Sequence, residues 1–75
     1  MNIHRYITVD PGICHGKPCF KGTRIMIYLV LEMLAAGESP NDIIENAYPQ
    51  LTQKYIDAVL EYSAQMAQRG HLVKI

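Results

Sequence analysis

The stretch SPNDIIENAYPQLTQKYIDAVLEYSAQMAQ, residues 39–68, carries the boundary signals of two consecutive helices. Ser39 is a preferred N-cap residue, and Pro40 suits the first helical position because its missing N–H is not needed there. Thr52 is a good N-cap for a second helix. A short helix, a tight turn and a longer helix form a helix-turn-helix arrangement. The predicted helices span residues 40–48 and 52–69.

A further helix is predicted upstream, over residues 25–36, with Gly37 as its C-cap. Glu32 is its single charged residue, so this helix is apolar nearly all round and needs cover on most sides. The rest of a 75-residue chain can hardly supply that cover. We therefore expect part of the helix to form a dimer or partner interface. The candidate interface residues are Ile27, Leu31 and Leu34.

A short β element is predicted before the helices, over residues 5–24. Residues 5–9 alternate and are rich in β-branched and aromatic side chains, which is typical of a strand. Pro18 lacks an N–H donor, so we expect it at the start or edge of a second short strand. Gly22 is expected to adopt a backbone angle that other residues avoid. Residues 71–75 are also β-prone.

The length of 75 residues indicates one small domain, residues 1–75. The predicted helices make its class mainly α. Apolar residues make up 49% of the chain, which favours burial of some of this surface between subunits, as in a homodimer. The longest apolar run, residues 25–31, is shorter than the roughly 20 residues that cross a bilayer. With no apolar leader at the start of the chain, we expect no membrane partner, a cytoplasmic location and two reduced cysteines.

Charge is balanced overall but divided along the chain. Residues 1–30 carry four basic residues against one acidic residue, whereas residues 31–65 carry six acidic residues against Lys54. A recognition helix contacts bases through its first residues, but this acidic helix pair cannot by itself neutralise phosphates. If DNA is bound, we expect the basic β element, which includes Arg5, to contribute more than the helix. The candidate DNA-binding residues are Thr52, Gln53, Lys54, Lys17, Lys21 and Arg24.

Three neighbouring side chains, Cys14, His15 and Cys19, could suggest a metal site or a nucleophilic cysteine. Structural zinc usually needs four ligands, and no residue in the sequence is evident as the orienting member of a catalytic set. We interpret the cysteines as small buried hydrophobes and predict no metal site, no cofactor and no catalytic residue.

Arg24 stands where the apolar helix begins, and it has two interpretations. It could contact a phosphate or a protein partner. It could also pair with Asp10 and tie the turn after the first strand to the start of the helix. The second interpretation is favoured because both residues flank the same small β region.

The segment DPGICHGKPCFKGTRI, residues 10–25, resembles the opening signature of family 433 of the domains of unknown function. That signature reads approximately D-P-x-x-x-x-G-K-P-x-[IF]-x-G-T-R-[IV], and the resemblance continues through residues 34–43 and 48–52. The family gives the matched residues no catalytic role, and we interpret them as structural. They are Asp10, Pro11, Gly16, Pro18, Gly22, Thr23 and Arg24.

The resemblance implies a small three-helix, homeodomain-like helix-turn-helix fold with a short N-terminal β element. The family is similar to VapB-type antitoxins, which implies a non-catalytic protein that binds and neutralises a PIN-like ribonuclease toxin and regulates its own operon through operator DNA. A standalone helix-turn-helix transcriptional regulator is an alternative. A small metal-binding protein or enzyme using the cysteines and His15 is a third.

Overall fold

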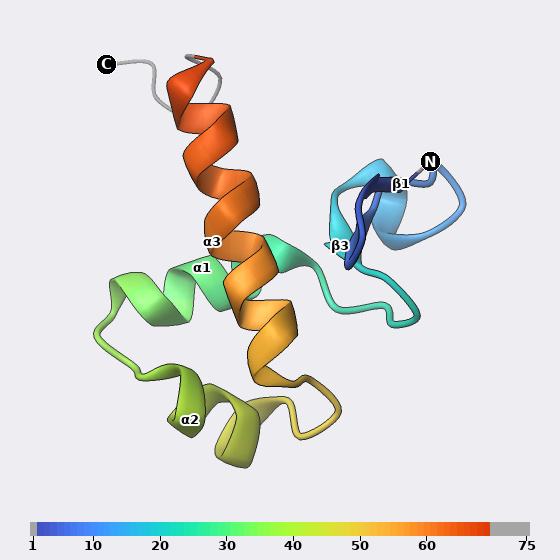
Figure 1. Ribbon diagram of the computed structural model, residues 1–75. Coiled ribbons are helices and arrows are strands. Elements are labelled where there is room, and N and C mark those ends of the chain that lie inside the picture. The colour runs from blue at the N-terminus through green and yellow to red at the C-terminus, as the bar shows by residue number, and fades with distance from the viewer. Residues whose placement is uncertain (1, 70–75) are drawn as a thin grey trace.

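The chain forms a small antiparallel sheet followed by helices, as shown by a computed structural model that describes residues 2–69 (Figure 1). Within these residues the sheet has three strands in the order β1-β2-β3, so the mainly helical class with a short N-terminal β element is confirmed. The elements are β1 (Asn2–His4), β2 (Ile7–Thr8), the 3-10 turn η1 (Cys14–Gly16), β3 (Cys19–Phe20), α1 (Ile27–Ala35), α2 (Pro40–Asp42), the π-helical turn η2 (Ile43–Ala47) and α3 (Gln53–Gln68).

The helix boundaries between α1 and α2 follow the sequence signals closely. Gly37 has φ +96°, and its N–H and that of Glu38 donate to the carbonyls of Leu34 and Met33, which is a Schellman C-cap. The Ser39 hydroxyl accepts a hydrogen bond from Asp42 N–H at 3.1 Å, as its N-cap position predicts. These two local caps fix the sharp connection between the helices.

Helix α3 begins after Thr52, as predicted, but the Thr52 side chain makes no capping hydrogen bond. Its carbonyl accepts from the N–H groups of Tyr55 and Ile56 instead. The preceding helix ends in a π-type turn, in which Tyr48 N–H donates to Ile43 O at 2.8 Å. Tyr48 leaves helical geometry because it precedes Pro49, whose ring disfavours the helical region for its neighbour.

Two predicted boundaries in the N-terminal half are wrong. Arg5 and Tyr6 form a turn between β1 and β2, so the strand expected over residues 5–9 is reduced to Ile7–Thr8. Helix α1 starts at Ile27 rather than residue 25, because Met26 pairs with Cys19 and extends the β structure. In both places β pairing with a nearby segment overrides the local sequence pattern.

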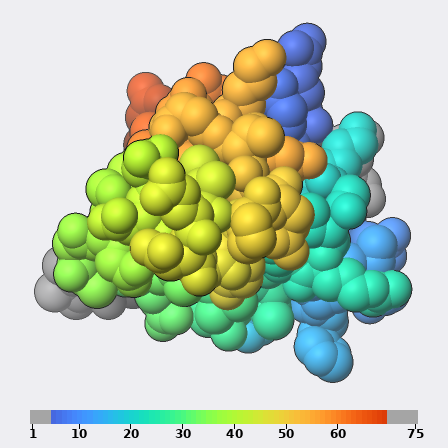
Figure 2. Space-filling model, turned by 90° about the horizontal axis from the view of Figure 1, so that it is seen from below, coloured from blue at the N-terminus to red at the C-terminus, as the bar shows by residue number. Residues whose placement is uncertain are grey.

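A single hydrophobic cluster joins the sheet to the helices. Ile7 and Phe20 are opposite each other on β2 and β3, and both are fully buried. In Figure 1 helix α3 crosses α1, and Figure 2 shows α2 and the connection to α3 covering one face beside the β region. The cluster consists of Ile7, Phe20, Ile25, Ile27, Val30, Ile43, Leu51, Ile56, Ala58 and Val59.

Helical spacing predicts that Ile56, Val59 and Leu60 lie on one apolar stripe of α3, and this prediction is wrong for Leu60. Leu60 is 47% exposed, whereas the small side chain of Ala58 is buried. None of the helices within residues 2–69 is long and apolar enough to cross a membrane. The β-prone segment 71–75 lies outside the described residues.

The contrast between Ile56 and Leu60, one turn apart on α3, gives a matched test of this core. Ile56→Ala removes a fully buried side chain and should lower the free energy of unfolding by about 3 kcal/mol. Leu60→Ala should change it by less than about 0.5 kcal/mol. Urea unfolding followed by circular dichroism measures both. Equal losses for the two variants would contradict the arrangement of α3.

Candidate binding surfaces

Tyr55 attaches the β region to the first turns of α3. Its hydroxyl donates a hydrogen bond to the carbonyl of Lys21 at 3.0 Å. Its ring meets Tyr6 edge-on at a centroid distance of 5.3 Å and Phe20 at 5.6 Å. Lys21 N–H in turn donates to Tyr6 O at 2.8 Å. This network places the basic residues Arg5 and Lys21 close to the start of α3.

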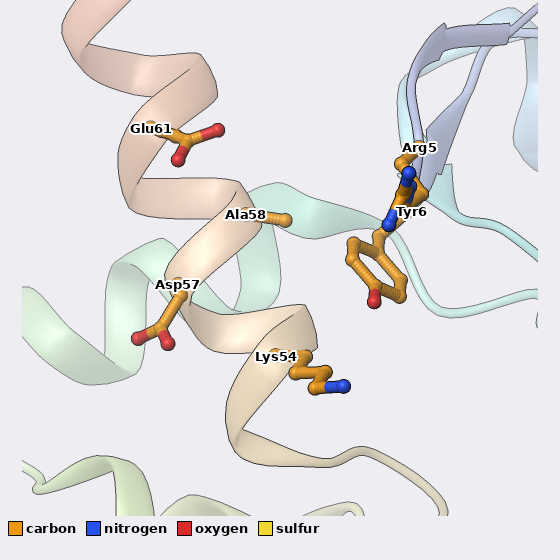
Figure 3. A pocket seen from close by; sticks show the side chains of 6 residues that line it. All are labelled: Arg5, Tyr6, Lys54, Asp57, Ala58 and Glu61. Carbon is orange, nitrogen blue, oxygen red and sulfur yellow. The ribbon is translucent and has the colours of Figure 1, made fainter.

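A charged groove of about 400 Å³ opens between the turn after β1 and α3 (Figure 3). The Lys54 side chain extends from α3 on the side of Tyr6 and Arg5, whereas Asp57 turns away from them (Figure 3). The groove is therefore mixed in charge, with Arg5 on the β turn and Lys54 on α3 as its basic residues. Its lining residues are Arg5, Tyr6, Lys54, Asp57, Ala58 and Glu61.

The structure divides the predicted DNA-binding residues between different surfaces. Lys54 lines the charged groove, and the Lys21 carbonyl is hydrogen bonded to the neighbouring Tyr55. Gln53 is exposed, and its side-chain amide donates to the Asp57 carboxylate at 2.9 Å, which occupies one of its donors within the helix. Exposed side chains are also found at the remaining predicted positions, Thr52, Lys17 and Arg24.

A second, more apolar groove of about 310 Å³ lies between α1, α3 and the segment before β3. Tyr28 is 42% exposed, and the Lys17 ammonium lies 5.2 Å from the centre of its ring, which is a cation–π contact. The Ser63 hydroxyl is buried without a hydrogen-bond partner. The lining residues of this apolar groove are Lys17, Pro18, Ile27, Tyr28, Leu31, Tyr62 and Ser63.

This groove corrects one of the predicted interface residues. Ile27 is only 4% exposed and belongs to the core, so it can form the floor of the groove but not an outer contact. Leu31 lines the groove, while Leu34 is partly buried against the core. Tyr28 and Tyr62 were missed, because helical periodicity alone does not show which aromatic side chain faces outward.

Residues 7–63 match DUF433, a family described as a protein of unknown function. The chain belongs to the DUF433 family. Its fold is similar to the crystal structure of a DUF433 member protein from Anabaena variabilis ATCC 29413, with a TM-score of 0.77 and 25% sequence identity over 89% of this chain. The present chain spans 65% of the length of that protein. No curated protein matches this chain significantly.

The DUF433 signature residues lie between β2 and α1, mostly in the turns on either side of β3. Gly22 has φ +82°, as predicted, and the next residue, Thr23, donates its hydroxyl to Phe20 O and accepts from Ile25 N–H. Gly16 also has a positive φ, +78°. The turn at Gly22 and Thr23 directs the chain from β3 into α1, whereas Gly16 lies in the turn before β3.

Asp10 has a different hydrogen-bond partner from the one expected. Its carboxylate accepts from Gly12 N–H at 2.8 Å, stabilising the turn after β2. No ion pair joins Asp10 to Arg24 within residues 2–69, so the proposed tie between them is wrong. The Arg24 backbone carries the local contact instead, because its carbonyl accepts from the Cys14 thiol at 3.2 Å.

The two cysteines of this DUF433 protein are neighbours in space. Cys14 is partly buried and Cys19 fully buried. Burial, together with the nearby Cys14 side chain, raises the pKa of the Cys19 thiol to about 11. Among the described residues, no group of three or more His, Cys, Asp or Glu side chains is placed to hold a metal ion.

The attachment of the sheet to α3 can be tested at one hydroxyl group. Tyr55→Phe keeps the ring contacts but removes the donor to Lys21 O, so the free energy of unfolding should fall by about 1 kcal/mol. The matched control is Tyr28→Phe, where the tyrosine is exposed and a change below about 0.5 kcal/mol is expected. Chemical denaturation measures both, and an unchanged Tyr55→Phe variant would disprove the role of this hydrogen bond.

Proposed function

We propose that this chain is a non-catalytic binding protein, the antitoxin of a toxin–antitoxin pair, which binds and neutralises a PIN-like ribonuclease. The observation that carries this proposal is the apolar groove, where Tyr28 is 42% exposed beside Leu31 and Lys17. Tyrosine is among the residues that contribute most to protein interfaces, because its ring offers a large contact area at low entropic cost.

The chemistry of the groove defines the partner surface that would fit it. The floor is apolar, through Ile27 and Leu31, and the rim carries the Lys17 ammonium. A partner that inserts an apolar side chain next to a carboxylate would bury the floor and pair with the rim. The unpaired Ser63 hydroxyl adds a hydrogen-bonding group at the same place.

A second role, binding of operator DNA, is supported by the basic residues of the charged groove. Arg5 and Lys54 line the groove. The Lys21 carbonyl accepts a hydrogen bond from Tyr55, which follows Lys54 on α3, so the backbone of Lys21 lies near the same corner. We propose that α2 with η2 and α3 act as a helix-turn-helix pair, with this corner contacting phosphates. A homodimer would present two such corners to the DNA.

The toxin-binding proposal predicts that Tyr28→Ala weakens binding more than tenfold, because an exposed aromatic anchor is lost. Leu60→Ala is the matched control: it removes another exposed apolar side chain, from α3 and outside the groove, and should alter affinity less than about twofold. Calorimetric titration with a PIN-like ribonuclease, the proposed toxin, measures both. A ribonuclease that neither binds the unaltered protein nor loses activity would refute the neutralisation.

The DNA-binding proposal predicts that Lys54→Gln weakens binding to the chain's own promoter uniformly across sequences. It should also reduce the slope of log K against log salt by about 1, as loss of one phosphate contact does. Lys17→Gln makes the same charge change in the apolar groove and should leave that slope unchanged. Fluorescence anisotropy over a salt series measures the slope. Equal effects of both variants would exclude the charged groove as the DNA contact.

A further inference from the structure

Cys14 and Cys19 bring their thiols together at a corner of the fold beside the apolar groove. The Cys14 thiol donates to Arg24 O at 3.2 Å, and the Cys19 thiol donates to Thr23 O at 3.8 Å. The two sulfur atoms thus lie against consecutive carbonyl groups, and Cys14 is near enough to contribute to the raised pKa of Cys19. A disulfide requires two cysteines to be neighbours in space in this way.

The backbone around Cys14 is held in an uncommon conformation. Cys14 has φ +53° and His15 has φ +56°, and Gly16 continues the left-handed run at +78°. The left-handed region costs a residue other than glycine roughly 1–2 kcal/mol, so the surrounding hydrogen bonds must maintain it. One of them is Lys17 N–H to Cys14 O at 3.0 Å. This turn reverses the chain and sets residue 14 beside residue 19.

The two thiols differ in their access to solvent. Cys14 is partly exposed, whereas Cys19 has no exposed surface and its pKa is raised to about 11. A small oxidant therefore reaches Cys14 first, while Cys19 stays protonated and protected beneath it. By access to solvent, Cys14 has the position of a peroxide-reactive cysteine and Cys19 the position of the adjacent resolving cysteine.

We propose that Cys14 and Cys19 form a reversible intramolecular disulfide when the protein meets hydrogen peroxide. The Cys14 sulfur attacks one peroxide oxygen, the O–O bond breaks, and Cys14 becomes a sulfenic acid with release of water. The Cys19 sulfur then attacks the Cys14 sulfur, the S–O bond breaks, and the Cys19 proton leaves with the hydroxide as a second water. The two thiols are oxidised by two electrons and one peroxide is reduced to two waters.

The disulfide alters the wall of the apolar groove. It removes the S–H donors from the carbonyls of Thr23 and Arg24, and it closes a ring that contains Lys17 and Pro18. Both of these residues line the apolar groove, and Lys17 rests over Tyr28. Oxidation therefore changes the partner surface, a consequence that depends on the proposed function, whereas the disulfide itself does not.

The test uses the full chain with equimolar hydrogen peroxide, followed by alkylation, trypsin digestion and mass spectrometry. Trypsin releases residues 6–21 as one peptide holding both cysteines, because the bond between Lys17 and Pro18 resists cleavage. We expect this peptide to lose two hydrogen atoms and to resist alkylation at both sites, in monomeric protein. Dithiothreitol should restore both thiols.

Two variants separate the roles of the cysteines. Cys19→Ala should stop at the Cys14 sulfenic acid, which dimedone traps, whereas Cys14→Ser should leave Cys19 unmodified in folded protein. In the unaltered chain, a sulfinic acid at Cys14 beside a free Cys19, or disulfides only between chains, would overturn the proposal. If the internal disulfide forms but no ribonuclease binds in either redox state, the disulfide stands and the antitoxin proposal fails.

Discussion

The attachment of the sheet to α3 through Tyr55 is the constraint on which both grooves depend. The tyrosine ring packs between the aromatic side chains of the β region, and its hydroxyl is bonded to the Lys21 carbonyl. Besides this contact, the strands are tied to the helices through the buried side chains of Ile7 and Phe20 and through the segment that leads into α1. The charged groove lies directly beside this attachment, and the apolar groove lies where the same segment meets α1 and α3.

Helix ends that depend on a few adjacent residues could be predicted from the sequence. Boundaries and exposures that depend on packing or pairing between separate segments could not. The Ser39 cap and the Gly37 turn depend on a few adjacent groups, so their sequence signals were sufficient. The start of α1 depends on Met26 pairing with Cys19, which the apolar run conceals. Likewise, the exposure of Leu60 and the burial of Ala58 depend on which side of α3 packs against the rest of the fold, and the periodicity of α3 alone does not show this.

The candidate surfaces show the same limit. The sequence identified the basic side chains of the β element, but only folding separates Lys17, over Tyr28, from Lys21 and Arg5, beside Tyr55. Cys14 and Cys19 were interpreted as small buried hydrophobes, which describes Cys19 but misses its contact with Cys14. A left-handed turn at two residues other than glycine, which no common sequence signal marks, produces that contact.

The pairing of Met26 with Cys19 also protects an edge of the sheet from aggregation. Strand β3 ends the sheet order, and a free strand edge is a template for pairing with another chain, which leads to aggregation. Here the segment before α1 occupies that edge, through the bridge at Met26 and the hydrogen bond from Phe20 N–H to Ile25 O. Ile25 and Met26, which the apolar pattern assigns to the start of α1, therefore cover the edge of β3.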